Sequence, residues 1–254
     1  DCPAYLNETF SLPYERVGGF WFGGDWYGGR HAADGALWVI VADVTGHGYY
    51  AYLLAGALPG VWEACWTAVV ARSGDRATTA PVVARSPDRA TTMRPADLLR
   101  AMHDLLETCL PEGVYAECTL VRLGAEGTAT VAPAGGSRLL LRRGGGPPDL
   151  LKLRGGWLGL FPPSPADEKT WRLDAGDELL LGSDGAFDHL PDPDGDDLAA
   201  RLNIPASASL LDDVRGLLRE ALRQGPQQDD ITLVLLRRRA GRSPQSDGAD
   251  DVPV

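Results

Sequence analysis

The run Ala36–Ala42, ALWVIVA, is apolar over seven consecutive residues and rich in branched and aromatic side chains. Such a run is typical of a β-strand that is buried on both faces, because neither face offers polar side chains to solvent. A strand of this kind lies inside a sheet that other elements cover. The chain is therefore expected to fold into a layered domain with this strand in its interior.

The order of the predicted elements narrows the fold class. In chain order we predict strands within residues 5–44, helices at Tyr49–Ala71 and from Arg94 to Leu106, strands within Val114–Leu181, helices at Asp197–Leu202 and Ser209–Arg223, and a strand at Ile231–Arg237. Pro59 is expected to kink or interrupt the first helix. This order argues for an α+β fold with largely antiparallel sheets. The sequence contains no Gly-Lys-Ser/Thr loop that would indicate a nucleotide-binding fold.

An internal duplication separates the first two predicted helices. Val69–Thr79 reads VVARSGDRATT, and Val82–Thr92 reads VVARSPDRATT thirteen residues later. Two copies of so short a unit do not make a solenoid, so residues 69–93 are predicted to be a loop insertion in a single domain of residues 1–238. Residues 239–254 are polar, acidic and poor in apolar side chains, and we expect them to form a disordered tail.

The charge balance excludes some classes of partner. Acidic residues outnumber Lys and Arg by 35 to 24, which gives a formal net charge of -11 and disfavours binding to nucleic acid. The longest apolar runs are too short to cross a bilayer, so no membrane segment is expected. The four cysteines show no Cys-x-x-Cys spacing, which favours reduced, buried thiols and a cytoplasmic location.

Four aspartates share one context, because each lies at the end of a predicted core strand: Asp25, Asp43, Asp184 and Asp229. Any one of them alone is most simply a turn or cap residue. Four carboxylates at the rim of one sheet would repel one another and have raised pKa values unless cations compensated them. Oxygen ligands of this kind favour Mg²⁺ or Mn²⁺, and the lack of a His/Cys ligand set argues against zinc.

The motifs around these aspartates, in order and spacing, resemble those of the SpoIIE-like bacterial serine phosphatases. The motifs are Gly23–Tyr27 (GGDWY), Val41–Gly48 (VADVTGHG), Leu180–Gly185 (LLGSDG) and Asp229–Thr232 (DDIT). That family is a branch of the metal-dependent protein phosphatases of the protein phosphatase 2C type, and the resemblance extends over residues 5–238. It implies an αββα four-layer sandwich, with two mainly antiparallel sheets flanked by helices and a two-metal centre at one end.

The resemblance also implies roles for individual residues. The ligands of two Mn²⁺ or Mg²⁺ ions would be Asp25, Asp43, Asp184 and Asp229, together with the backbone carbonyl of Val44. Asp43 would then be a catalytic residue, because the two ions activate the attacking water. His47 would protonate the leaving serine oxygen, although a histidine that only packs in this glycine-flanked turn is an equal alternative. Asp230 is expected just outside the ligand set.

Two departures from the family pattern keep a second function open. Gly28 stands where relatives often carry an acidic residue, and Gly136 stands where they commonly carry histidine. The expected function is a metal-dependent phosphoserine/phosphothreonine protein phosphatase in bacterial signalling. Its alternative is a catalytically inactive pseudophosphatase that acts as a regulatory or scaffolding module. The resemblance implies a phosphoprotein substrate, with an anti-sigma-factor antagonist as one candidate, and it leaves a homodimer open.

Overall fold

The computed structural model describes residues 4–13, 15–17, 20–46, 49–78, 93–187, 209–223 and 227–239. In chain order its elements are β1 (Tyr5–Leu12), β2 (Glu15–Val17), β3 (Phe20–Phe22), β4 (Asp25–His31), β5 (Leu37–Val44), α1 (Tyr49–Thr78), α2 (Pro95–Cys109), β6 (Ala116–Leu123), β7 (Thr128–Ala134), β8 (Arg138–Arg142), β9 (Pro148–Lys152), a 3-10 turn (Pro165–Asp167), β10 (Lys169–Arg172), β11 (Glu178–Gly182), α3 (Asp184–Phe187), α5 (Leu210–Arg223) and β12 (Ile231–Arg238).

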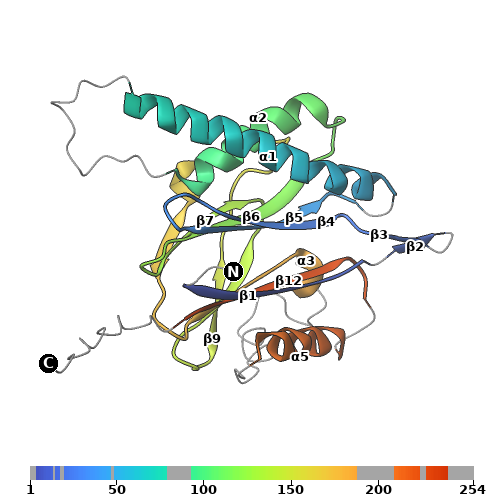
Figure 1. The fold of residues 1–254 in the computed structure, drawn as a ribbon. Helices are drawn as coiled ribbons and strands as arrows, with labels where there is room; N and C mark the ends of the chain where they lie inside the picture. Colours follow the sequence, from blue (N-terminus) through green and yellow to red (C-terminus); the bar gives the residue numbers. More distant parts are fainter. Residues whose placement is uncertain are drawn as a thin grey trace, which may run out of the picture.

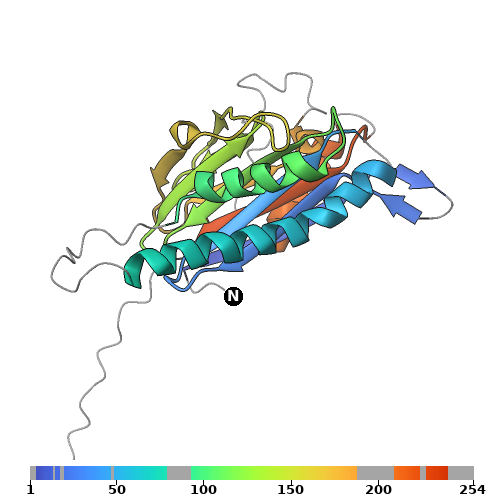
Figure 2. The same cartoon turned by 90° about the horizontal axis from the view of Figure 1, so that it is seen from above.

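Two five-stranded sheets form the centre of the molecule. Their strand orders are β1-β12-β11-β8-β9 and β10-β7-β6-β5-β4, and every neighbouring pair is antiparallel. Figure 1 shows the sheets stacked face to face, with α1 and α2 over one and α5 against the other. Figure 2 shows α1 and α2 lying across the same face of the sheet. The predicted αββα sandwich is therefore confirmed.

The two-sided burial of β5 explains its unbroken apolar sequence. Side chains alternate across a strand, so odd and even positions face different layers. Leu37, Val39 and Val41 belong to the core between the two sheets. Trp38 and Ile40 belong to the core under the helices. A third cluster, beneath α5, covers the outer face of the other sheet.

The helix α1 departs from the sequence prediction in two ways. It passes through Pro59 without ending, and it continues to Thr78. Three apolar residues around the proline are buried against the sheet: Ala55, Leu58 and Trp62. Their packing stabilises the helix on both sides of Pro59, although proline has no backbone N–H to donate. The first copy of the duplicated segment is therefore helical up to Thr78, and the prediction of a loop there was wrong. Residues 79–92 and the helix predicted at residues 197–202 lie outside the described residues.

None of the helices in the described ranges is at once long enough and apolar enough to cross a bilayer. The longest of them, α1, spans 30 residues but packs along a sheet.

Aromatic rings join α1 to the sheet beneath it. Trp66 meets Trp38 edge to face with ring centroids 5.3 Å apart, and it also lies 5.7 Å from Trp62. We expect Trp66→Ala to lower the free energy of unfolding by about 3–5 kcal/mol, because it removes a buried indole and leaves a cavity. Urea denaturation measures this loss. Tyr50→Ala, which truncates a ring that is 81% exposed, should change the same quantity by no more than about 0.5 kcal/mol. Equal effects of the two variants would contradict this account of α1.

Candidate metal centre

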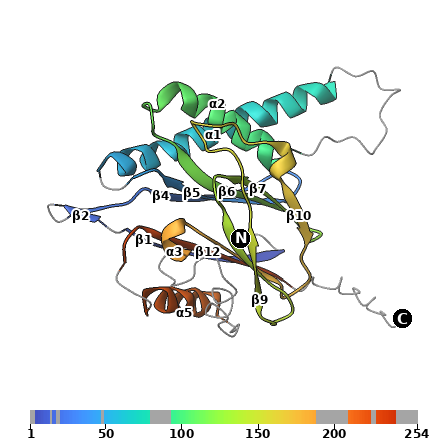
Figure 3. The ribbon, with the colours of Figure 1, turned by 180° about the vertical axis from the view of Figure 1, so that it is seen from behind.

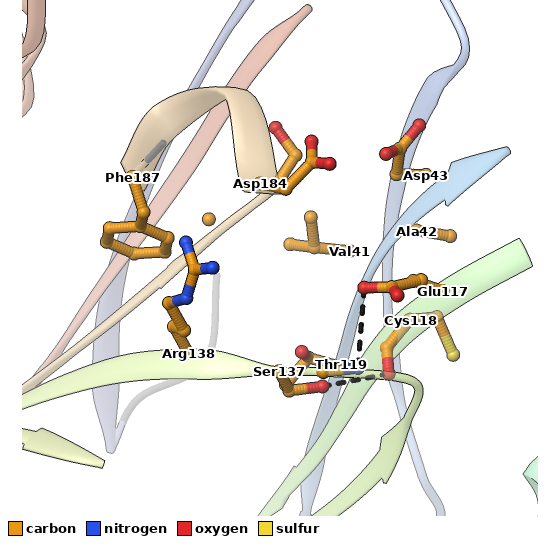
Figure 4. Close-up of a pocket in the computed structure, with 13 residues that line it drawn as sticks. Val41, Ala42, Asp43, Glu117, Cys118, Thr119, Ser137, Arg138, Asp184 and Phe187 are labelled. Carbon is orange, nitrogen blue, oxygen red and sulfur yellow. Dashed lines mark hydrogen bonds between the residues drawn. The ribbon is translucent and has the colours of Figure 1, made fainter. Parts of the chain in front are cut away.

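The two sheets each supply two of the four strand-end aspartates. Asp25 begins β4 and is the direct ladder partner of Asp43 near the end of β5. Asp184 begins α3 two residues after the end of β11, and Asp229 lies two residues before β12. Because β11 and β12 are neighbours, the second pair is also brought together by strand pairing. Figure 4 shows Asp43 and Asp184 facing each other across the space between the sheets.

The pKa of Asp43 reflects the acidic residues around it. Burial raises the pKa of Asp43 to about 10, and the negative charges of Asp184, Asp25 and Asp229 add to the increase. A carboxyl group that faces three others in a poorly solvated place holds its proton unless a cation is present. The other three aspartates therefore lie within electrostatic reach of Asp43, and their role as a shared ligand set stays a prediction.

Asp25 is buried without a hydrogen-bond partner for its carboxyl group among the described residues. Burial raises its pKa to about 7, while the nearby hydroxyls of Ser183 and Thr232 lower it. Those hydroxyls donate elsewhere, Ser183 to the backbone carbonyl of Asp230 and Thr232 to Ser11. Both carboxylate oxygens of Asp25 are buried and have no hydrogen-bond partner among the described residues. Buried oxygens in this state are suited to a hard cation, which would supply the missing contact.

The backbone around Gly24 leaves room for a ligand oxygen. The carbonyl oxygen of Val44 and the Oδ1 atom of Asp43 lie 3.1 and 3.4 Å from the place where a Cβ atom would stand on Gly24. A side chain at Gly24 would therefore crowd the two oxygens that the sequence assigns to the metal site. Glycine at this position keeps the Val44 carbonyl open next to Asp43.

Asp230 connects the motifs of the two sheets. It is buried, and its Oδ2 atom accepts a hydrogen bond of 2.5 Å from the backbone N–H of Gly24. The carbonyl of Asp230 lies so close to Gly185 that a Cβ atom there would come within 2.0 Å of it. Asp230 thus fixes the Gly23–Tyr27 motif against the turn that carries Asp184. Its prediction as a supporting residue agrees with these contacts.

The ligand set is not fully assembled. Among the described residues, no three Asp, Glu, His or Cys side chains converge closely enough to hold an ion as they stand. The binding of metal by these four aspartates therefore stays a prediction. His47 lies outside the described residues, so the structure does not place this predicted acid.

Sequence reasoning missed Glu117, which lies beside the centre. It is paired with Asp43 across β5 and β6, and together with Asp43 and Asp184 it lines a cavity of about 30 Å³ between the sheets. Its carboxylate accepts hydrogen bonds from the indole N–H of Trp157 at 2.7 Å and from the backbone N–H of Gly136 at 3.4 Å. No motif marks Glu117, and the one available signal was a carboxylate near the start of an otherwise apolar predicted strand.

Comparisons with known proteins agree with this arrangement. The family described as Stage II sporulation protein E (SpoIIE) matches residues 33–239. No curated protein sequence matches the chain. Among solved structures, the RsbU and RsbW domains of Rv1364c from Mycobacterium tuberculosis are similar, with a TM-score of 0.70 and 23% identity over 95% of this chain. The SiaA-PP2C domain of Pseudomonas aeruginosa follows, with a TM-score of 0.68 and 21% identity over 91% of this chain and 85% of that one.

A third similar structure contains metal. The catalytic domain of the serine threonine protein phosphatase PstP, in complex with two manganese ions, has a TM-score of 0.61 and 17% identity over 93% of this chain and 99% of that one. This chain spans only 62% of the Rv1364c structure. At these identities the structural matches establish the shared fold.

Proposed function

Because the chain belongs to the Stage II sporulation protein E (SpoIIE) family, we propose that it is a metal-dependent protein phosphatase acting on phosphoserine or phosphothreonine. The observation that supports this proposal is the set of four strand-end aspartates, three of which raise the pKa of the fourth, Asp43. Buried, mutually repelling carboxylates destabilise a fold, so their presence at one place calls for a ligand that compensates them. Divalent cations that also bind phosphoryl oxygens would do so.

The donor chemistry of the residues present, carboxylate and carbonyl oxygens with no partner on Asp25, suits two Mn²⁺ or Mg²⁺ ions, although the side chains would have to draw together around them. The ligands would be Asp25, Asp43, Asp184 and Asp229, with the Val44 carbonyl. When bound, such ions lower the pKa of a water molecule and neutralise charge on the phosphoryl oxygens. The PstP structure holds two manganese ions, and a structure of RsbX contains magnesium, and both proteins share this fold.

The chain's own residues hold the reacting groups in place. Asp43 is central, because the other three aspartates all act on its pKa. Asp230 fixes the backbone of Gly24, which keeps the Val44 carbonyl accessible next to Asp43. The fold therefore orients oxygen ligands from two sheets, and no side chain has to form a covalent bond to phosphorus.

The cysteine in the cavity does not supply a nucleophile. Cys118 lines the same space but is buried, and burial together with the charge of Glu117 raises the pKa of its thiol. A thiol has to ionise before it can attack phosphorus, and this one stays protonated at neutral pH. Water is therefore the nucleophile that this site favours over a cysteine.

The partner that we propose is a phosphoprotein of a bacterial signalling system, such as an anti-sigma-factor antagonist, in the cytoplasm. A structure described as the bacterial stressosome, a modular system adapted to control secondary messenger signalling, shares the fold, and so do the RsbU and RsbW domains of Rv1364c. The proposal also includes the association of two copies of the chain as a homodimer.

Hydrolysis of p-nitrophenyl phosphate tests the proposal. We expect turnover with Mn²⁺ or Mg²⁺, and loss of turnover when a chelator removes the ions. Asp184→Asn should remove activity under all conditions, because it takes away one ligand. If the folded protein binds the cations but never turns over, the inactive scaffolding module is the better assignment. This alternative rests on Gly28 and Gly136, the two departures from the family pattern, and the retention of all four strand-end aspartates counts against it.

A further inference from the structure

The connection between β9 and β10 passes over the end of β6 that carries the candidate metal centre. Figure 3 shows it as the yellow segment running from β9 past β6 to α2. Leu158 forms two backbone hydrogen bonds of 3.0 Å with Ala116, the first residue of β6, and its side chain is fully buried. Gly159 donates its N–H to the Nδ1 atom of His103 on α2 at 3.1 Å. The segment is therefore held from two sides.

Exposed apolar side chains follow directly after this anchored residue. Leu160 is 43% exposed and Phe161 is 54% exposed. Phe161 lies 6.2 Å from Trp157, and Trp157 lies 5.8 Å from Tyr115, measured between ring centroids. We call Tyr115, Trp157, Leu160 and Phe161 the aromatic ledge. Leu160 and Phe161 are exposed beside the half-buried rings of Tyr115 and Trp157, and exposed apolar side chains grouped with aromatic rings are a feature of binding sites.

The aromatic ledge is continuous with the metal centre. The indole of Trp157 donates to Glu117, which is the ladder partner of Asp43. On the other side, the carbonyl of Tyr115 accepts hydrogen bonds from the backbone and the hydroxyl of Thr45, two residues after Asp43. A substrate whose phosphate lies at Asp43 therefore has this ledge next to it.

The charge of the segment limits what can bind there. Residues Gly155–Pro165 contain no charged side chain, in a chain where 23% of residues are charged. The neighbouring centre is acidic and will be satisfied by cations. The ledge itself offers apolar surface and ring faces, which suit an apolar or aromatic side chain better than a charged one.

We propose that the aromatic ledge binds an apolar or aromatic side chain of the substrate phosphoprotein, a few residues from the phosphoserine. The proposal rests on the proposed function, because the phosphate has to lie at the aspartates for its flanking residues to reach the ledge. An extended peptide advances about 3.3 Å per residue, so a side chain a few positions away can reach a surface that adjoins the centre. The ledge would then give sequence preference to a centre that by itself recognises only phosphate and metal.

Synthetic phosphoserine peptides test this proposal. They are identical except for one phenylalanine, which replaces glycine in turn at each of the five positions on either side of the phosphoserine. We expect the wild-type protein with Mn²⁺ to show a kcat/KM about tenfold higher for phenylalanine at one or two positions. That preference should disappear in Phe161→Ala and weaken in Leu160→Ala, while hydrolysis of p-nitrophenyl phosphate and the melting temperature stay unchanged.

The matched control is Leu211→Ala. It makes the same substitution at a leucine that is 37% exposed on α5, against the other sheet, and it should keep the full preference. Equal rates for all peptides, a preference that survives in Phe161→Ala, or turnover of p-nitrophenyl phosphate without any peptide turnover would each overturn the ledge proposal. A dimer that dissociates in Phe161→Ala would assign the ledge to a second copy of the chain instead. Failure of the wild type to hydrolyse p-nitrophenyl phosphate would count against the proposed function itself.

Discussion

Asp43→Asn is expected to lower kcat for p-nitrophenyl phosphate by at least about 1000-fold at saturating Mn²⁺. Asp43 is the carboxyl group on which the other three aspartates act, so it has the central position in the proposed ligand set. The change keeps the size of the side chain but removes its charge and one ligand oxygen. Metal ions contribute several kcal/mol of transition-state stabilisation, and about 1.4 kcal/mol corresponds to a factor of ten in rate.

Asp34→Asn is the matched control for this experiment. Asp34 lies in the turn before β5, at the other end of the strand from Asp43, and pairs with Arg122 at 2.6 Å. The substitution is chemically identical, and kcat should stay within about twofold of the wild type because surface ion pairs contribute little. Metal binding can be followed separately by calorimetry, where Asp43→Asn should lose affinity. Near-normal turnover by Asp43→Asn would contradict the assignment of the metal centre to this position.

The stability of the metal-free protein is expected to fall as pH rises from about 5 to 9. The folded-state pKa values of Asp25, about 7, and Asp43, about 10, lie above the unfolded value near 4. Between those limits the folded state binds more protons than the unfolded state, so raising the pH favours unfolding. Each group contributes at most about 1.4 kcal/mol per pH unit, with both acting up to about pH 7 and Asp43 alone above it.

Urea denaturation in the presence of a chelator measures this dependence. In Asp43→Asn the free energy of unfolding should decrease less steeply with pH, because one of the two carboxyl groups that release a proton has been removed. This variant should also be more stable than the wild type at pH 8. Saturating Mn²⁺ should abolish the decrease, since bound cations favour the ionised carboxylates. If the urea midpoint of the metal-free protein is constant or rises between pH 5 and 8, the carboxyl groups are not forced together.

Short-range patterns in the sequence predicted much of this structure. The apolar run Ala36–Ala42 indicated a doubly buried strand, and β5 is covered on both faces. The strand-end positions of Asp25, Asp43, Asp184 and Asp229 predicted a shared site, because strand ends meet at sheet edges. The structure brings these four together, while their binding of metal stays a prediction.

Other features depend on contacts between distant residues, which no local pattern encodes. The path of α1 through Pro59 is decided by the sheet beneath the helix, and propensity alone predicted a break there. Glu117 reaches the centre through its register with Asp43, 74 positions earlier in the chain, and through Trp157, 40 positions later. Periodicity shows that a strand exists but not which residue of another strand it pairs with.

Because both faces of β5 are apolar, the pattern of polar and apolar residues does not determine its register with the neighbouring strands. In most strands a slip of one residue would expose apolar side chains, but here both faces are apolar and such a slip would be hidden. The register is determined instead by how the side chains pack. Trp38 packs edge to face against Trp66 on the helix side, whereas the residues that β5 presents to the other sheet, such as Val39, are aliphatic. The contact of the Trp38 indole with Trp66 therefore fixes the register of β5. The position of the Asp43 carboxylate depends on this side chain, which lies five residues away and packs under the helices.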